Sequence, residues 1–308
     1  MHSFDETVFA DDLNAFKAFP HCTENSEIVN ALGQCQDSVH KWGQANQVIF
    51  DASKESFHIL DRRRPAGDNF RILGVTFDPK LVMDVACSEI AGHAHSRLKS
   101  LLRSRNYFSI EIRIDLYKSH VLSYIEYATP AIYHAPRFFL GMVDRVQETL
   151  LEETGLSAEA ALLEFSLAPL PTRRDIAMMG LLYRICKGNA PPQFNSLIRR
   201  STGARFPRNL RHPEAQHNQQ LHDPLDGSVG PMMERSALSL IHTFNMLPAF
   251  VVEAVGVSAF QRHLQNGVKR AHQLGYAEWA SLLQTGVRKM SLNSFHQLFQ
   301  LQTRCRGG

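Results

Sequence analysis

Apolar residues near the start of the chain fall in short runs broken by polar turns. Residues 6–9 and 13–16 are two such runs, and Ala10, Asp11 and Asp12 separate them. This pattern predicts two strands joined by a tight turn. The next apolar residues recur at steps of three and four, which predicts an amphipathic helix: Ile28, Leu32, Cys35, Val39 and Trp42.

Three further runs in this part of the chain are typical of strands. Residues 48–50 and 57–60 are brief, and residues 70–77 form the best candidate strand of the chain. Gly74 lies inside that last run and predicts a bulge or a close backbone approach. Strands mixed with one helix indicate an α+β fold for this region.

Helical spacing dominates after about residue 85. Helices are predicted over 88–105, 110–134, 142–151 and 173–187, with Thr172 as the N-cap of the last. Pro, His, Gln and Asn accumulate over 201–230, which predicts a linker. Helices are again predicted over 232–247 and from Ser258, in capping-box spacing with Gln261, to Gly275.

Composition and charge narrow the class of protein. With 308 residues and 44% hydrophobic residues, the chain can form a real core. It has no uninterrupted run of about 18 apolar residues and no secretory signal, and its five cysteines are scattered. We therefore expect an intracellular protein, nuclear or cytoplasmic, with free thiols and no membrane contact.

The net charge of +3 hides an asymmetry between the two ends. Residues 1–61 contain ten acidic residues and three lysines, a balance of −7, so the remainder carries +10. An acidic pole that holds cations, followed by a basic body, suits an enzyme that acts on a polyanion. Ordinary variation of surface charge is the alternative.

The adjacent carboxylates of Asp11 and Asp12 are the first candidate chemistry. Neighbouring aspartates repel each other, so a bound cation is one reason for them to persist. A solvated turn is the alternative, because Asp is common in turns. The order of the motifs that follow favours the interpretation that Asp11 and Asp12 bind a cation.

Four segments follow the aspartate pair in a fixed order. They are the helix that ends at Trp42, residues 46–54 with Lys54, residues 70–78, and a helical region with residues 116–118 and 124–127. Together with residues 9–12 they resemble the C-terminal half of the reverse transcriptase of non-LTR (LINE-like, jockey-type) retrotransposons. Residues 167–175 resemble the region that trails the polymerase in such elements.

The resemblance implies an α+β fold, with a small partial polymerase palm followed by a helical thumb and a C-terminal helical extension. It implies an RNA-directed DNA polymerase, a nucleotidyltransferase that uses two Mg²⁺ ions. Asp11 and Asp12 correspond to metal ligands, and Lys54 lies where the family has a lysine near the nucleotide phosphates. Leu73, Gly74 and Val75 resemble the primer-grip hairpin. A solvated surface lysine is the alternative for Lys54.

Basic residues of the predicted helices 88–105 and 110–134 would line the thumb in this reading. Lysine and arginine contact nucleic-acid phosphates without regard to sequence. The alternative is an ordinary solvated helix face. The candidate nucleic-acid-binding residues are Arg97, Lys99, Arg103, Arg105, Arg113 and Lys118.

One departure from the family pattern limits the expected activity. The family also needs a third aspartate and the nucleotide-gripping fingers upstream of the hairpin, whereas eight residues precede Phe9. The metal site is therefore expected to be incomplete in this chain. We expect a polymerase fragment that is inactive alone and needs a separate N-terminal half.

The expected organisation follows from these assignments. The palm fragment covers residues 1–85, the thumb and connection 86–200, the linker 201–230, and the C-terminal helical region 231–308. The expected partners are an RNA template, a DNA primer and deoxynucleotides. The alternative function is a catalytically dead remnant whose helical part binds nucleic acid or a protein partner.

Overall fold

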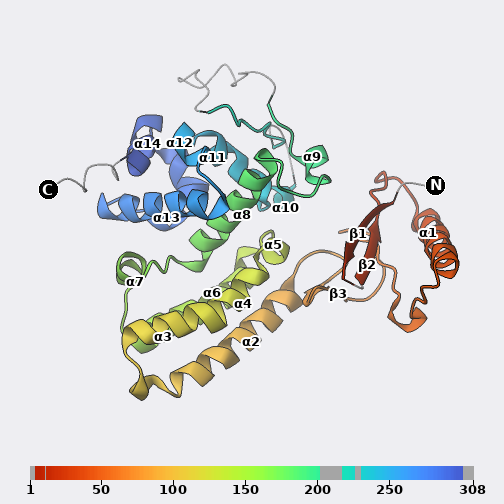
Figure 1. Ribbon diagram of the computed structural model, residues 1–308, viewed down its shortest axis with the longest axis horizontal. Coiled ribbons are helices and arrows are strands. Elements are labelled where there is room, and N and C mark those ends of the chain that lie inside the picture. Colours follow the sequence, from red (N-terminus) through yellow and green to blue (C-terminus); the bar gives the residue numbers. More distant parts are fainter. Residues whose placement is uncertain (1–3, 11, 202–216, 226–229, 301–308) are drawn as a thin grey trace. The chain divides into compact units, whose positions relative to one another are not determined.

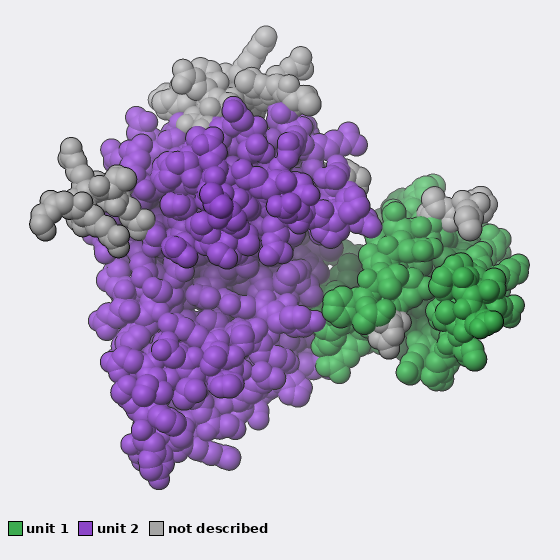
Figure 2. All heavy atoms as spheres, viewed as in Figure 1, with its two compact units in different colours: residues 1–83 green, residues 84–308 purple. Residues whose placement is uncertain are grey.

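The structure is a computed structural model that describes residues 4–10, 12–201, 217–225 and 230–300. It divides into two compact units, residues 1–83 (unit 1) and residues 84–308 (unit 2), which Figure 2 colours separately. The described part is mostly helical and has two small antiparallel hairpins. The predicted α+β class is confirmed at this level.

Unit 1 contains two hairpins and one long helix. β1 (Asp5–Phe9) pairs with β2 (Asp12–Phe16), and β3 (Phe70–Ile72) pairs with β4 (Val75–Phe77). The helix α1 (Asn25–Ala45) lies between the two hairpins in the sequence. The hairpin predicted around the aspartate pair and the helix that follows it are both confirmed.

The strand predictions for the rest of unit 1 are wrong. Residues 70–77 do not form one bulged strand, because Leu73 (φ 46°) and Gly74 (φ 82°) make a two-residue turn between β3 and β4. Residues 48–50 form no strand, and within 57–60 only Ile59 pairs, in an isolated bridge to Ala66. A strand needs a neighbour for its backbone groups, and none of the described segments pairs with residues 48–50.

Unit 1 buries few side chains. Of its apolar residues with described positions, only Ile59, Val75 and Met83 are buried. The apolar stripe of α1 is half-buried at best, and Trp42 at its end is 57% exposed. The sequence pattern therefore predicts the helix correctly, although the helix lacks a dense core to cover its stripe.

Unit 2 begins with a long helix that packs against a later one. α2 (Asp84–Leu102) packs along α6 (Arg137–Thr154) and continues through a 3₁₀ turn (Arg105–Tyr107) into α3 (Ile110–Tyr117). Figure 1 shows α2 and α3 joined at this turn. α6 ends at Gly155 (φ 67°), as expected for a helix that closes with a left-handed residue.

The single helix predicted over 110–134 is interrupted. After α3 the chain passes through a π-helical turn (Lys118–Leu122) into α4 (Ser123–Tyr127) and α5 (Thr129–Ile132). Pro130 lies in the first turn of α5, where its missing N–H costs no helical hydrogen bond. The apolar stripe stays buried through these changes, at Ile114, Tyr117, Val121, Ile125 and Ile132.

α8 (Leu170–Cys186) is the central helix of the larger core. α7 (Ala158–Phe165) precedes it and α9 (Phe194–Leu197) follows it. Thr172 is not the N-cap of α8, since Pro169 takes that position and the Thr172 hydroxyl donates to the carbonyl oxygen of Ala280 at 2.5 Å. The long-range partner replaces the expected local one.

The C-terminal helices pack around α8. The longest is α13 (Val257–Gln273), and it contacts both α8 and the last described helix, α14 (Leu292–Gln300). The helix predicted over 232–247 is divided into three pieces, and Ser258 lies inside α13, whose N-cap is Gly256. The remaining short elements are α10 (Pro231–Glu234), a 3₁₀ turn (Ala237–Leu240), α11 (Ile241–Asn245) and α12 (Ala249–Val252).

Part of the stretch expected to be a linker belongs to this core. His217 and Leu221 are buried, with 4% and 2% exposure. The His217 Nε2 atom lies 3.0 Å from the carbonyl oxygen of Phe244, and the Asn245 side chain bonds both backbone groups of Leu221. Residues 217–221 are thus held in unit 2 by specific contacts.

No helix in the described ranges has both the length and the apolar character needed to cross a bilayer.

Candidate functional site

The β1–β2 hairpin presents one of the two predicted metal ligands. Asp12 is the first residue of β2 and pairs with Phe9 across the hairpin, and Ala10 adopts φ 54° in the turn. Asp11 lies outside the described residues. Asp12 is exposed, and its carboxylate has no hydrogen bond or ion pair to any residue with a described position.

The residues described here do not suffice for a pair of Mg²⁺ ions. Such a site needs several carboxylate oxygens around two cations about 4 Å apart. Asp12 supplies one carboxylate, and no group of three His, Cys, Asp or Glu side chains converges in the described ranges.

Lys54 lies on a separate short element of unit 1. It ends a 3₁₀ helix (Ala52–Lys54) that Asp51 caps by accepting hydrogen bonds from the backbone and hydroxyl groups of Ser53. These bonds lower the pKa of the Asp51 carboxyl. The Lys54 side chain is 84% exposed, and its Nζ lies 3.9 Å from Asp51 Oδ2. Its ammonium group is accessible to an anionic ligand.

The three primer-grip-like residues lie at the second hairpin. Leu73 and Gly74 form its turn, and Val75 begins β4 with only 7% exposure. The Arg71 guanidinium donates to the carbonyl oxygen of Gly74 at 3.1 Å and supports the turn. The side chain of Leu73 is 41% exposed. The Val75 side chain is therefore part of the packing of unit 1, whereas the Leu73 side chain extends from the hairpin turn into solvent.

The six predicted nucleic-acid-binding residues fall into two groups. Arg97, Arg105 and Lys118 are engaged within the protein: the Arg97 guanidinium lies 4.2 Å from the Tyr124 ring centre, and Arg105 and Lys118 pair with Glu153 and Asp115. Lys99 and Arg103 are exposed and pair with none of the described acids. Arg113 is half-buried, and its Nε has no hydrogen-bond partner.

Lys99 lies in the last turn of α2, and Arg103 follows directly after its end, where the Arg103 N–H still donates to the Lys99 carbonyl oxygen at 3.2 Å. Lys99 and Arg103 are four residues apart, so they are neighbours on the helix surface. His95 is also four residues from Lys99, and the lysine charge together with burial lowers the His95 pKa, burial being the larger cause. This row can attract a polyanion. Arg113 and Lys118 lie apart from this row, on α3 and in the π-helical turn that follows it.

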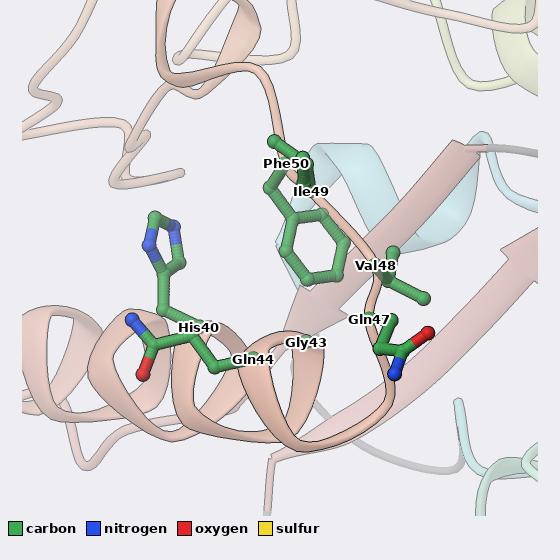
Figure 3. Close-up of a pocket in the computed structure, with 7 residues that line it drawn as sticks. All are labelled: His40, Gly43, Gln44, Gln47, Val48, Ile49 and Phe50. Atoms are coloured by element: carbon green, nitrogen blue, oxygen red, sulfur yellow. The ribbon is translucent and has the colours of Figure 1, made fainter.

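A pocket on α1 was not predicted from the sequence. Figure 3 shows the Phe50 ring over Gly43, beside His40. The His40 and Phe50 rings stack at 5.8 Å, and a Cβ atom on Gly43 would lie 2.7 Å from the Phe50 ring. The conformation of residues 47–50 creates this pocket. The spacing of apolar residues in the sequence does not predict that conformation.

His40 also belongs to a polar cluster beside the pocket. Its Nε2 lies 2.8 Å from Glu55 Oε1, and the Gln36 amide donates to the other oxygen of Glu55. These hydrogen bonds, the Gln36 bond first, lower the pKa of Glu55. The cluster ties α1 to the segment after Lys54.

A polar cluster of several side-chain bonds lies at the start of α8. Arg174 makes two bonds to Asp144, at 2.6 and 2.9 Å, and Arg173 bonds Glu126 at 2.5 Å. Asp175 Oδ1 accepts from the Tyr133 hydroxyl at 2.8 Å and from Gln284 at 2.7 Å. Burial raises the Asp175 pKa to about 6. These side chains connect α8 to α4, α6 and the segment before α14.

This cluster explains residues 172–175 without a ligand. Every one of the four side chains is bonded to a different part of unit 2. Buried polar groups need such partners, because an unpaired one costs stability. From the sequence this segment was marked by its family resemblance and by the N-cap predicted at Thr172, whereas in the structure its side chains join helices.

Comparison of the chain with protein-family models, with curated proteins and with solved structures found no match.

Proposed function

We propose that this chain is part of the RNA-directed DNA polymerase of a non-LTR retroelement. Unit 1 would contribute to the palm and the first helices of unit 2 to the thumb. The order of elements in unit 1 supports this: an acidic hairpin, a helix, a short turn with Lys54, and a second hairpin. Each element carries one of the motifs on which the resemblance rests.

One observation carries the proposal. The hairpin that bears Asp12 exposes large apolar side chains beside the acidic turn, with Val8 69%, Phe9 64% and Phe16 48% exposed. Leaving such side chains in water forgoes the free energy of burial, so a surface of this kind favours a partner that covers it. A complementary polymerase half would cover it and add the missing carboxylate.

A primer-extension assay tests this proposal. The purified chain is mixed with an RNA template, a DNA primer, deoxynucleotides and Mg²⁺, with and without a separately expressed fingers-and-palm half of a non-LTR polymerase. We expect no extension by the chain alone and extension when the half is added. Failure of the mixture, with both polypeptides folded, contradicts the proposal.

Substitution of the acidic turn sharpens the assay. Asp11→Asn with Asp12→Asn should abolish the reconstituted activity, because a two-metal reaction depends on these carboxylates. Asp37→Asn is the matched control, since Asp37 is also an exposed acid of unit 1 and lies on α1, away from the Lys54 element. Equal activity of both variants contradicts a metal role for the acidic turn.

The second candidate function is a nucleic-acid-binding helical module without catalysis. The exposed cations Lys99 and Arg103, at the C-terminal end of α2 and directly after it, favour it, because they have no acidic partner among the described residues. Unchanged nucleic-acid binding in the double aspartate variant, with no activity under any mixture, supports this module. Loss of reconstituted activity in that variant supports the polymerase.

A further inference from the structure

Tyr107 is the most exposed aromatic side chain in the described part of the chain, at 84%. It lies in the turn between α2 and α3, and its ring contacts no other described ring or cation. Exposed aromatic rings lose the free energy that burial would give them. A ring held in this position is available to a planar ligand.

The backbone beneath Tyr107 is fixed by short-range hydrogen bonds. The Tyr107 N–H donates to the Ser104 carbonyl at 3.0 Å, and the Ser104 hydroxyl donates to the Leu101 carbonyl at 2.7 Å. On the other side, the Ser109 hydroxyl caps α3 by accepting from the Ile112 N–H at 3.5 Å. The turn therefore holds the ring out on a defined support.

Charge around the turn has one sign along the sequence. Residues 90–110 contain no Asp or Glu and carry Arg97, Lys99, Arg103 and Arg105. Arg103 is exposed, and the Arg105 side chain is 54% exposed although it pairs with Glu153. An exposed ion pair of this kind is weak, so Arg105 can exchange partners for a phosphate at little cost.

We propose that the α2–α3 turn binds single-stranded nucleic acid, with a base stacked on Tyr107 and the flanking phosphates on Arg103 and Arg105. Stacking on an aromatic ring needs an unpaired base, whereas the paired bases of a duplex are already stacked on one another. Arginine supplies the matching contacts to the backbone. The inference rests on the proposed function for its substrate class, and it adds a base-stacking position at Tyr107 and a preference for single strands to the phosphate contacts predicted for Arg103 and Arg105.

A direct binding measurement tests the proposal. Fluorescence anisotropy of the full chain is recorded with labelled single-stranded RNA, single-stranded DNA and a duplex of the same sequence. We expect Tyr107→Ala to weaken binding of both single strands by about five- to a hundredfold, the range found for loss of one stacking contact. Tyr107→Phe keeps the ring and should bind as the unchanged chain does.

Two matched controls separate this site from general surface effects. Phe138→Ala removes another highly exposed ring of unit 2, and Arg145→Gln removes another exposed arginine that pairs with a glutamate. Neither should change binding. Arg103→Gln with Arg105→Gln should lower the slope of log K against log salt by about 1.4, because each lost single-strand phosphate contact contributes about 0.7.

Several results overturn the proposal. The first is that the unchanged chain binds no nucleic acid. The second is that Tyr107→Ala binds single strands as tightly as the unchanged chain does. The third is that Tyr107→Ala weakens binding of the duplex and of single strands equally. The proposal would also be overturned if Tyr107→Ala lost binding only to vesicles of anionic lipid and bound nucleic acid like the unchanged chain. An inactive polymerase mixture leaves this measurement intact, so failure of the proposed function and failure of this site are distinguishable.

Discussion

Unit 1 and unit 2 differ most in what their helices cover. In unit 2, α8, α13 and α14 bury one continuous cluster that includes Leu182, Phe244, Phe260, Leu264 and Phe295. In unit 1, the long helix α1 buries only Gly43, and ten large apolar side chains between Val8 and Leu73 are exposed. In both units the spacing of apolar residues predicts helices that the structure contains, but only unit 2 has a dense core.

This difference separates local structure from stability. Short helices and hairpins are marginal in water unless they pack, because ordering the backbone costs entropy that few contacts offset. Unit 2 supplies that packing from helices far apart in the sequence. Unit 1 keeps its apolar groups available, which is the property that the proposed polymerase complement requires.

The largest expected effect is in thiol reactivity. Burial raises the pKa of Cys87 and Cys186 in unit 2 to about 12 and about 11, whereas Cys22 of unit 1 is exposed. Since the thiolate is the reactive form, both buried thiols should react at least about a hundredfold more slowly than Cys22. Mass spectrometry of timed alkylation at pH 8 checks this. Comparable rates would show that unit 2 opens as readily as unit 1.

Core truncation should give the next largest effect. Phe260→Ala removes a fully buried ring from α13, and we expect a loss of about 3–5 kcal/mol in the free energy of unfolding. Trp42→Ala in unit 1 removes a larger but exposed ring, and we expect a change within about 0.5 kcal/mol. Urea unfolding followed by circular dichroism measures both. Equal losses would refute the contrast between the units.

Asp175 gives unit 2 a specific pH dependence. Its pKa in the folded protein is about 6, above the ordinary value of 3.8, because burial disfavours the charged form. The stability due to the protonated acid is therefore present below about pH 4 and is lost as the pH rises through about 6. Asp175→Asn keeps an oxygen for Tyr133 and Gln284 and cannot ionise.

We expect Asp175→Asn to gain stability relative to the unchanged chain between pH 4 and pH 7, on the order of 2–3 kcal/mol. Chemical unfolding at a series of pH values measures this gain. Asp115→Asn, at an exposed acid on α3, is the control and should show no such trend. A gain that does not change with pH would contradict the assignment to Asp175 ionisation.

Substitution of one glycine in each unit is expected to give the smallest effect, and the two positions are closely matched. A Cβ atom on Gly43 of unit 1 would lie 2.7 Å from the Phe50 ring and 2.8 Å from the backbone oxygen of Val48, and one on Gly267 of unit 2 would lie 2.6 Å from the Phe299 ring. Phe50 is half-buried beside an open pocket and can move, whereas Phe299 is 6% exposed in the core.

We therefore expect Gly267→Ala to cost about 1–3 kcal/mol. Gly43→Ala should cost less than Gly267→Ala, about 1 kcal/mol, because the exposed residues 47–49 can shift with the Val48 oxygen and alanine favours the helix. Thermal unfolding compares the two variants, and NMR of the His40 ring reports movement of Phe50. A larger loss for Gly43→Ala would mean that unit 1 is the more tightly packed of the two.

The sequence predicted most helices and the acidic hairpin because these depend on short-range spacing. Ile28 to Trp42 specify α1, and the residues on either side of Asp12 specify β1 and β2. The spacing gave a wrong prediction at Leu73, where a strand-like run contains a turn and only the family resemblance implied a hairpin, and at Thr172, where the hydroxyl bonds a distant partner and does not cap the helix. Both errors arise from hydrogen bonds or turns that spacing does not encode.

By itself the sequence determined the element order, the α+β class, the acid-free stretch from Ile90 to Ile110 and the motifs that suggest a polymerase. Only the tertiary structure decided that Arg174 and Asp175 join helices, that His217 is buried, and that Tyr107 is exposed in the turn that follows Arg103 and Arg105. Spacing fixes which face of an element is apolar, because side-chain direction follows the backbone period. Which partner covers that face depends on packing between segments distant in the chain, and in unit 1 much of that face has no cover.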